Sequence, residues 1–371
     1  MMATSTKGQM QMPFHWIYVL IAGAVILLFF VSIVVKQKDS ATQQLGTEVN
    51  RILESIVGAA SVSESTKSVI STAGLADETL YFQCVVSKNG DSREAVMEYG
   101  LKEKGVSVKD TILPLFAPAE IKGTQLFLWS LPYTLPFKII DFLYVTGPTM
   151  QYVLVGESAL GQEFLKEAES VVDPTSKIKF KINVEKVADV NSISSSQGFA
   201  VRIVDYSGGA IQTGSPIPLS LQEKADREVS AVVFGDGKKV TFFQKEGKVW
   251  KLEGAATLFS LNGDLDAVRY AAIFAANKEM FDCGMMQAFK RAQLVSAVYA
   301  GRAEQVMGAA LSQQGVCPVK VSGLTEMIEK QKSLAESCVA LYPDSCSDLV
   351  ANGAQLKELN SKLGDGCIPL Y

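Results

Sequence analysis

One unbroken apolar segment near the N-terminus constrains the fold of this chain more than any other feature. Phe14–Val35 is 22 consecutive residues without Asp, Glu, Lys or Arg. As a helix it would be about 33 Å long, enough to cross a bilayer core. Trp16 and Tyr18 near its start and Lys36 just after its end are typical of membrane interfaces. We therefore expect a retained transmembrane helix. The alternative, a cleaved secretory signal, usually has an apolar core of only about 7–15 residues.

All the cysteines follow this segment, and they indicate the side of the membrane on which the rest of the chain lies. An even number of cysteines without a C-x-x-C motif favours disulfides over metal or redox chemistry. We therefore expect a single-pass cell-membrane protein with its large C-terminal part outside the cytoplasm. Lys36 and Lys38 favour the opposite orientation weakly, because the positive-inside rule loses force before a long domain. The six cysteines are Cys84, Cys283, Cys317, Cys338, Cys346 and Cys367.

The spacing of the last four cysteines predicts how they pair. Residues 324–341 and 348–363 have helical patterns and are joined at Pro343-Asp344. An antiparallel helical hairpin would place Cys338 and Cys346 on either side of the turn.

Cys317 and Cys367 lie 21 residues outside that inner pair, so they would meet at the open end of the hairpin. By elimination, Cys84 would join Cys283. The alternative is a zinc site built from the last four cysteines, although zinc ligands usually come in closely spaced pairs.

The remaining patterns predict an α/β (α+β) body between the membrane helix and a helical C-terminal region. Apolar, proline-punctuated segments after residue 111 favour strands. Asp236-Gly237 and Glu246-Gly247 are strong hairpin turns. The predicted parts are an N-terminal tail (1–13), the transmembrane helix (14–35), a helical stalk and linker (36–75), the α/β body (76–260) and a helical region ending in an α-hairpin (261–371).

A narrow apolar stripe runs along the predicted stalk. Leu45, Val49, Ile52 and Ile56 are spaced four, three and four residues apart, as in a heptad repeat. The stripe is typical of an amphipathic helix that packs on its own domain. The alternative is self-association through the stalk helix.

The chemistry available to the body is limited, because the only histidine is His15. A Ser-His-Asp site, a Cys-His site and a His-ligated zinc site are therefore excluded from residues 36–371. Gly156–Gly161 resembles a nucleophile elbow, but its spacing is G-x-S-x-x-G, and Ser158 is better explained as a helix N-cap. Asp264 and Asp266 could form an acidic pair for a divalent cation or begin a helix. No catalytic residue, cofactor site or metal site is assigned.

Charge and composition argue against nucleic acid as a partner. The formal net charge is -4, and no run of five Lys or Arg residues occurs. Nucleic-acid binding needs a concentrated basic surface. The expected partners are the lipid bilayer and either a second copy of the chain, through the stalk, or another envelope protein.

Two short stretches resemble known membrane proteins. Lys7-Gly8-Gln9, before an apolar helix, resembles the processing site of archaeal type IV prepilins, in which cleavage follows the glycine. The chain departs from that pattern because no Glu follows shortly after Gly8. The segment 272–304 and the surroundings of Trp129 resemble single-pass membrane-anchored proteins of small-genome archaea, a resemblance that implies no activity.

Taken together, these features favour a non-enzymatic, membrane-anchored envelope protein that acts as an interaction, adhesion or pilin-like module. The lack of histidine in the body carries this preference. The alternative is an extracytoplasmic ligand sensor or a carboxylate-based or metal-dependent hydrolase.

Overall fold

The computed structural model divides the chain into two compact units, Met1–Ile52 and Leu53–Tyr371. We describe each unit by itself. The residues that the structure describes are 18–33, 36, 67–72, 79–89, 92–102, 106–111, 113–168, 171–172, 179–194, 198–236, 238–261, 266–311, 317–362 and 371.

The first unit corrects the predicted membrane anchor. Its described helical residues are 18–33 and 36. Among the described residues, no helix combines the length and the apolar character that crossing a membrane requires. The transmembrane part of the predicted fold class and the single-pass membrane localisation are therefore not supported, and a mixed α/β fold replaces them.

Several residues of the sequence-based predictions lie outside the described part of the chain. Processing at Gly8 and association through the stalk stay predictions. The residues concerned are Gly8, Gln9, Phe14, Trp16, Val35, Leu45, Val49, Ile52 and Ile56.

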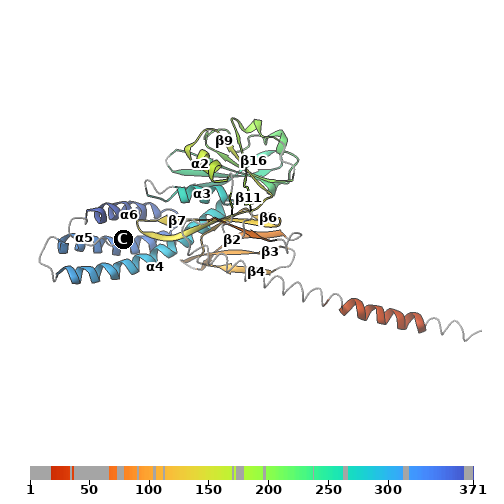
Figure 1. The fold of residues 1–371 in the computed structure, drawn as a ribbon, viewed down its shortest axis with the longest axis horizontal. Helices are drawn as coiled ribbons and strands as arrows, with labels where there is room; N and C mark the ends of the chain where they lie inside the picture. The colour runs from red at the N-terminus through yellow and green to blue at the C-terminus, as the bar shows by residue number, and fades with distance from the viewer. Residues whose placement is uncertain are drawn as a thin grey trace, which may run out of the picture. The chain divides into compact units, whose positions relative to one another are not determined.

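A six-stranded sheet forms one layer of the second unit (Figure 1). Its order is β12-β9-β13-β14-β15-β16. The first four strands are parallel to each other, and β15 is antiparallel to both of its neighbours, β14 and β16. Helix α2 (Ala159–Ala168) connects two of the parallel strands through the short pair β10 (Val171–Val172) and β11 (Lys179–Phe180). The strands are β9 (Met150–Val155), β12 (Asn183–Val187), β13 (Ala200–Asp205), β14 (Val229–Phe234), β15 (Lys239–Glu246) and β16 (Val249–Thr257).

Two four-stranded sheets complete the β-structure, in the orders β1-β7-β8-β5 and β4-β3-β2-β6. The first contains β1 (Lys67–Ser71), β5 (Leu115–Phe116), β7 (Gln125–Thr134) and β8 (Lys138–Thr146). The second contains β2 (Thr79–Asn89), β3 (Ser92–Leu101), β4 (Val106–Asp110) and β6 (Glu120–Lys122).

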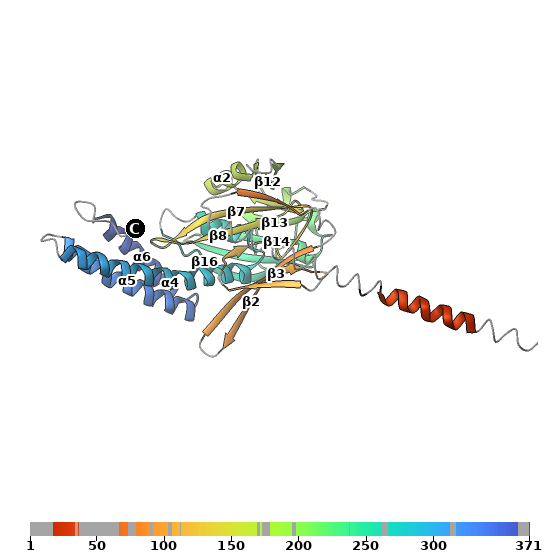
Figure 2. The same cartoon turned by 60° about the horizontal axis from the view of Figure 1, so that its bottom comes forward.

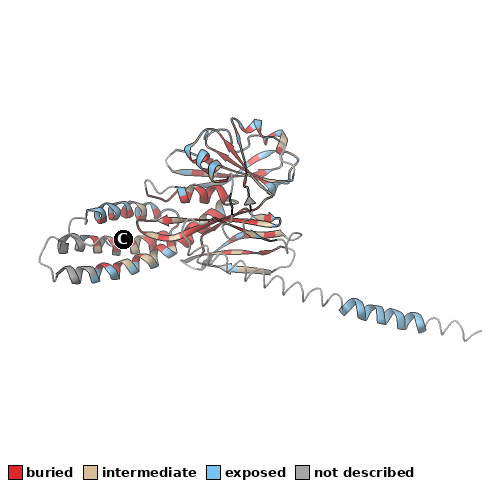
Figure 3. Cartoon of the chain, in the orientation of Figure 1, coloured by how far each residue is buried: buried red, intermediate tan, exposed pale blue. Residues whose placement is uncertain are grey.

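Helix α3 (Asp266–Phe274) packs between the six-stranded sheet and the β1-β7-β8-β5 sheet. The ring of Tyr270 lies 4.5 Å from that of Trp129 on β7, and the ring of Phe274 lies 5.4 Å from that of Tyr152 on β9. The hydroxyl of Tyr144 donates a 2.7 Å hydrogen bond to the carbonyl of Ala267. Seven of the nine α3 residues are buried by these contacts, and Figure 3 colours the residues by burial.

Three long helices form a bundle, which Figure 2 shows from a second side. They are α4 (Lys278–Leu311), α5 (Cys317–Ala340) and α6 (Cys346–Ser361). Buried amides connect the bundle to the sheets: Asn352 donates to the Gln331 side chain at 2.7 Å, and Gln331 donates to the carbonyl of Leu135 at 3.2 Å.

Two of the predicted disulfides are present, Cys338–Cys346 at the α5–α6 turn and Cys84–Cys283 between β2 and α4. All four described cysteine side chains are therefore oxidised. Cys367 and the side chain of Cys317 lie outside the described residues, so the outer pair of the hairpin stays a prediction.

One strand of the β-structure comes before the predicted start of the body. β1 (Lys67–Ser71) lies inside the segment assigned to stalk and linker, yet it pairs antiparallel with β7, with Val69 opposite Phe127. Val69 and Ile70 are the β-branched residues of this short strand, and its partner lies about 60 residues further along the chain. Local sequence could not reveal such a pairing.

Candidate functional site

The segment that resembles a nucleophile elbow, Gly156–Gly161, lies at the start of α2. Ser158 Oγ accepts a 3.4 Å hydrogen bond from the backbone N–H of Gly161, and the Ser158 carbonyl accepts one from Gln162 at 3.0 Å. Glu157 pairs with Lys186 at 2.6 Å, and the hydrogen bond from that ammonium holds the pKa of Glu157 below its usual value. Ser158 is therefore an N-cap, as its sequence position predicts.

The acidic pair before α3 is not brought together as a cation site. Asp266 begins α3 and lies 3.5 Å from Arg269, while Asp264 is outside the described residues. Within the described ranges, no group of three or more His, Cys, Asp or Glu side chains is arranged to hold a metal ion.

A cavity of about 740 Å³ lies at the N-terminal edge of the parallel strands. One wall is a single row of the six-stranded sheet, in which Tyr152, Arg202, Ser230 and Gln244 are direct neighbours on four adjacent strands. The segment around β6 forms a second wall, and the connection between α3 and α4 forms a third. The cavity thus lies where three parts of the fold meet.

The sheet face changes character at this row. The next row on the same face consists of Leu154, Val204, Val232 and Phe242, each two residues away from the cavity residue on its own strand. All four are buried and form part of the apolar interior. The row that lines the cavity instead brings a guanidinium, a hydroxyl and an amide to central strands, where polar groups are costly without partners.

Arg202 joins the sheet to the C-terminal end of α3. Only 2% of this residue is exposed, and its guanidinium donates to the carbonyls of Ala272, Ile273 and Ala276 at 3.0, 3.3 and 3.1 Å. These acceptors belong to the orphan carbonyls at a helix end. Burial lowers the pKa of Arg202 to about 10, and the negative charge of Glu253 opposes that shift. The side chain therefore keeps its positive charge at neutral pH beside the cavity.

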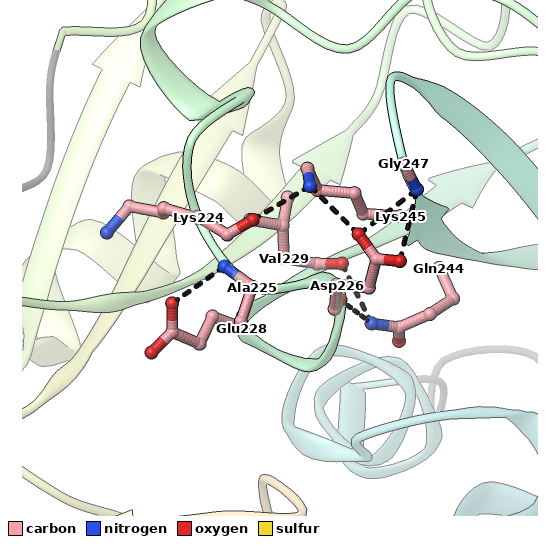
Figure 4. Close-up of polar contacts among 8 residues, drawn as sticks. All are labelled: Lys224, Ala225, Asp226, Glu228, Val229, Gln244, Lys245 and Gly247. Atoms are coloured by element: carbon pink, nitrogen blue, oxygen red, sulfur yellow. Dashed lines mark hydrogen bonds and ion pairs between the residues drawn. The ribbon is translucent and has the colours of Figure 1, made fainter.

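The rim of the cavity is built by the short helical turn η4 (Asp226–Glu228) and the residues before it (Figure 4). Lys245, on β15, donates to the carbonyl of Lys224 at 2.8 Å and to Asp226 Oδ1 at 2.9 Å. The backbone N–H of Gly247 also donates to Asp226 at 3.1 Å. These contacts lower the pKa of Asp226, the Lys245 hydrogen bond contributing most.

The same network fixes both ends of the turn. Gln244 donates to the carbonyl of Val229 at 3.0 Å and also to that of Asp226, while Glu228 accepts from the backbone N–H of Ala225 at 3.1 Å. On the cavity side, Lys224 Nζ donates to the carbonyl of Phe199 at 2.6 Å. The rim is therefore held by hydrogen bonds from β15 and by the hydrogen bond to the carbonyl of Phe199, just before β13.

The mouth of the cavity carries two less constrained cations. The Arg227 side chain is 68% exposed and lies 3.7 Å from Glu120, and Glu120 also pairs with Lys102 at 2.5 Å. Lys122 at the end of β6 is exposed, and its backbone carbonyl accepts from the hydroxyl of Thr149 at 2.8 Å. Both cations line the cavity and face solvent.

Comparison with known proteins gives no relative for this chain: no family model, no curated protein and no solved structure matches it.

Sequence reasoning did not identify the cavity residues. Arg202 could have been noticed, because it is the one polar residue among the first five of β13 (Ala200–Asp205). An arginine in a buried strand needs several hydrogen-bond acceptors. Lys245 is less conspicuous, as a lysine near the end of a strand that contains two phenylalanines. The row to which Arg202 belongs depends on strand register, which cannot be read from the sequence.

Proposed function

We propose that this protein is a non-enzymatic binding module that takes a small ligand into the cavity beneath the polar row. The observation that carries this proposal is the row itself, Tyr152, Arg202, Ser230 and Gln244, which replaces apolar side chains on central strands where the cavity opens. A volume of about 740 Å³ lies within the roughly 300–1,000 Å³ of ligand pockets.

The hydrogen bonds of the lining carboxylates favour binding over catalysis. Asp226 accepts from Lys245 and from the backbone of Gly247, and Glu228 accepts from the backbone of Ala225. A general acid or base must instead present its proton-transfer atom to the substrate. These carboxylates shape the rim, and a shaped, preformed rim is what a binding site requires.

The test uses the full chain and the uncharged fluorescent probe N-phenyl-1-naphthylamine. We expect saturable binding of one probe, which Ser230→Phe weakens at least about tenfold, because the new ring occupies the cavity. Ser333→Phe, at an exposed position of α5, is the matched control and should bind as the unmodified chain does.

Thermal unfolding of each variant shows that it is folded. If Ser230→Phe does not fold, Ala200→Leu at the cavity edge replaces it. Equal probe binding by the cavity variant and by Ser333→Phe would contradict the proposal, because the probe would then sit elsewhere on the chain.

A further inference from the structure

Building on the proposed binding function, we infer that the ligand is an organic anion with an apolar body. The charged groups of the cavity and the apolar residues of its wall point to this class independently.

Positive charge exceeds negative charge around the cavity. The lining residues carry four basic side chains, Lys122, Arg202, Lys224 and Arg227, and three acidic ones, Glu120, Asp226 and Glu228. The charged groups that act on them are Lys102, Lys245 and Glu253, so the whole set holds six basic and four acidic side chains, an excess of two positive charges.

The positive charges differ in how far they are already neutralised. Asp226 is paired with Lys245, and Glu120 with Lys102. Among the described residues, no carboxylate lies within ion-pair distance of Arg202: its guanidinium donates to carbonyl oxygens and lies 5.5 Å from the ring of Phe242. The negative charge of Glu253 acts on it only from further away. The field of such a buried cation reaches across a low-dielectric cavity, where a ligand anion would be attracted to it.

The apolar part of the ligand follows from the rest of the wall. Met150 and Phe199 are half-buried cavity residues, and Pro118 and Phe274 are buried ones. Half-buried apolar side chains at a cavity surface gain free energy when a ligand covers them. A bare inorganic ion would leave them exposed to water, so the ligand must contribute apolar surface.

Two probes with the same ring system separate charge from apolar contact. 8-Anilino-1-naphthalenesulfonate carries a sulfonate that N-phenyl-1-naphthylamine lacks. We expect the anionic probe to bind about tenfold more tightly at low salt, and this advantage to shrink as salt screens the site.

The double variant Lys122→Gln/Arg227→Gln removes the two exposed cations without touching the buried hydrogen bonds. It should weaken binding of the anionic probe about tenfold and leave the uncharged probe unaffected. Arg302→Gln/Lys330→Gln, at exposed positions of the bundle, removes the same net charge and should leave both affinities unchanged.

The outcomes separate this inference from the proposed function. If both probes bind in the cavity with equal affinity, or if the two double variants behave alike, the ligand is not selected as an anion and the inference fails while the binding function stands. If Ser230→Phe affects neither probe, the cavity binds neither and both proposals fail.

Discussion

Lys245 holds a positive charge where charge is costly, because only 3% of its side chain is exposed. Its ammonium is acceptable there because a carbonyl and a carboxylate accept from it, at 2.8 and 2.9 Å. The partner, Asp226, is half-exposed and is also held by the backbone of Gly247. One buried side chain thus fixes the residues that form the cavity rim.

At the residue scale, we predict that Lys245→Met lowers the free energy of unfolding at neutral pH by about 1–2 kcal/mol, the net value of its charged hydrogen bonds. The loss should shrink in acid. The pKa of Asp226 is lowered in the folded state, chiefly by Lys245, so its contribution is present above the unfolded pKa of about 3.9 and lost as pH falls through the folded value.

Urea unfolding followed by circular dichroism between pH 7 and pH 2.5 measures both effects. Lys251→Met on the neighbouring strand is the control, because the Lys251 side chain is 58% exposed and should matter little. A stability gap between wild type and Lys245→Met that stays constant through the acid range would show that Asp226 is not its cause.

At the element scale, α4 depends on a close approach to the β1-β7-β8-β5 sheet. A Cβ atom at Gly284 would lie 2.5 Å from the ring of Phe116 on β5, and Phe281, one turn earlier, has its ring 6.3 Å from the same ring. The next glycine of the helix, Gly301, has no atom within 4 Å of such a position.

These two glycines of one helix give opposite predictions. Gly284→Ala should destabilise the protein by about 1–3 kcal/mol through overpacking. Gly301→Ala should stabilise it by up to about 1 kcal/mol, because alanine loses less backbone entropy in a helix. Thermal unfolding of both variants decides the matter, and a shift in the same direction for both would mean that Phe116 moves aside easily.

Elements were predictable where the information is local. The meander of β14, β15 and β16 follows from its turns, and the α5–α6 hairpin follows from helical patterns joined at Pro343. β9 (Met150–Val155) is one of the strands expected after residue 111, and it directly follows Gly147-Pro148. In each case the residues that decide the structure lie within about ten positions of each other.

The candidate site was not predictable, because its residues meet only through register between strands. Tyr152 lies 50 residues before Arg202, and the two become neighbours only when β9 pairs with β13. The predicted membrane helix is also not supported: among the described residues, no helix is long and apolar enough to cross a membrane.

At the scale of the whole molecule, the two described disulfides constrain the unfolded chain very unequally. Cys84 and Cys283 are separated by 199 positions, whereas Cys338 and Cys346 are separated by 8. In the chain-entropy description, closing the longer loop stabilises the folded state by about 5 kcal/mol and closing the shorter one by about 2.5 kcal/mol.

We therefore predict that Cys84→Ser/Cys283→Ser lowers the free energy of unfolding about twice as much as Cys338→Ser/Cys346→Ser. Guanidinium unfolding of the two oxidised double variants measures this ratio. A larger loss from the short bridge would mean that it acts on the native α5–α6 turn rather than on the unfolded chain.

The long disulfide also gives this part of the molecule the topology of a covalent ring. The six-stranded sheet and α3 lie entirely between Cys84 and Cys283. A protease that cuts an exposed loop within the ring, such as residues 207–210, opens the ring but releases no fragment. The nicked protein stays in one piece until the bridge is reduced, so a single cut in the layer of the six-stranded sheet would not change the mass of the protein under oxidising conditions.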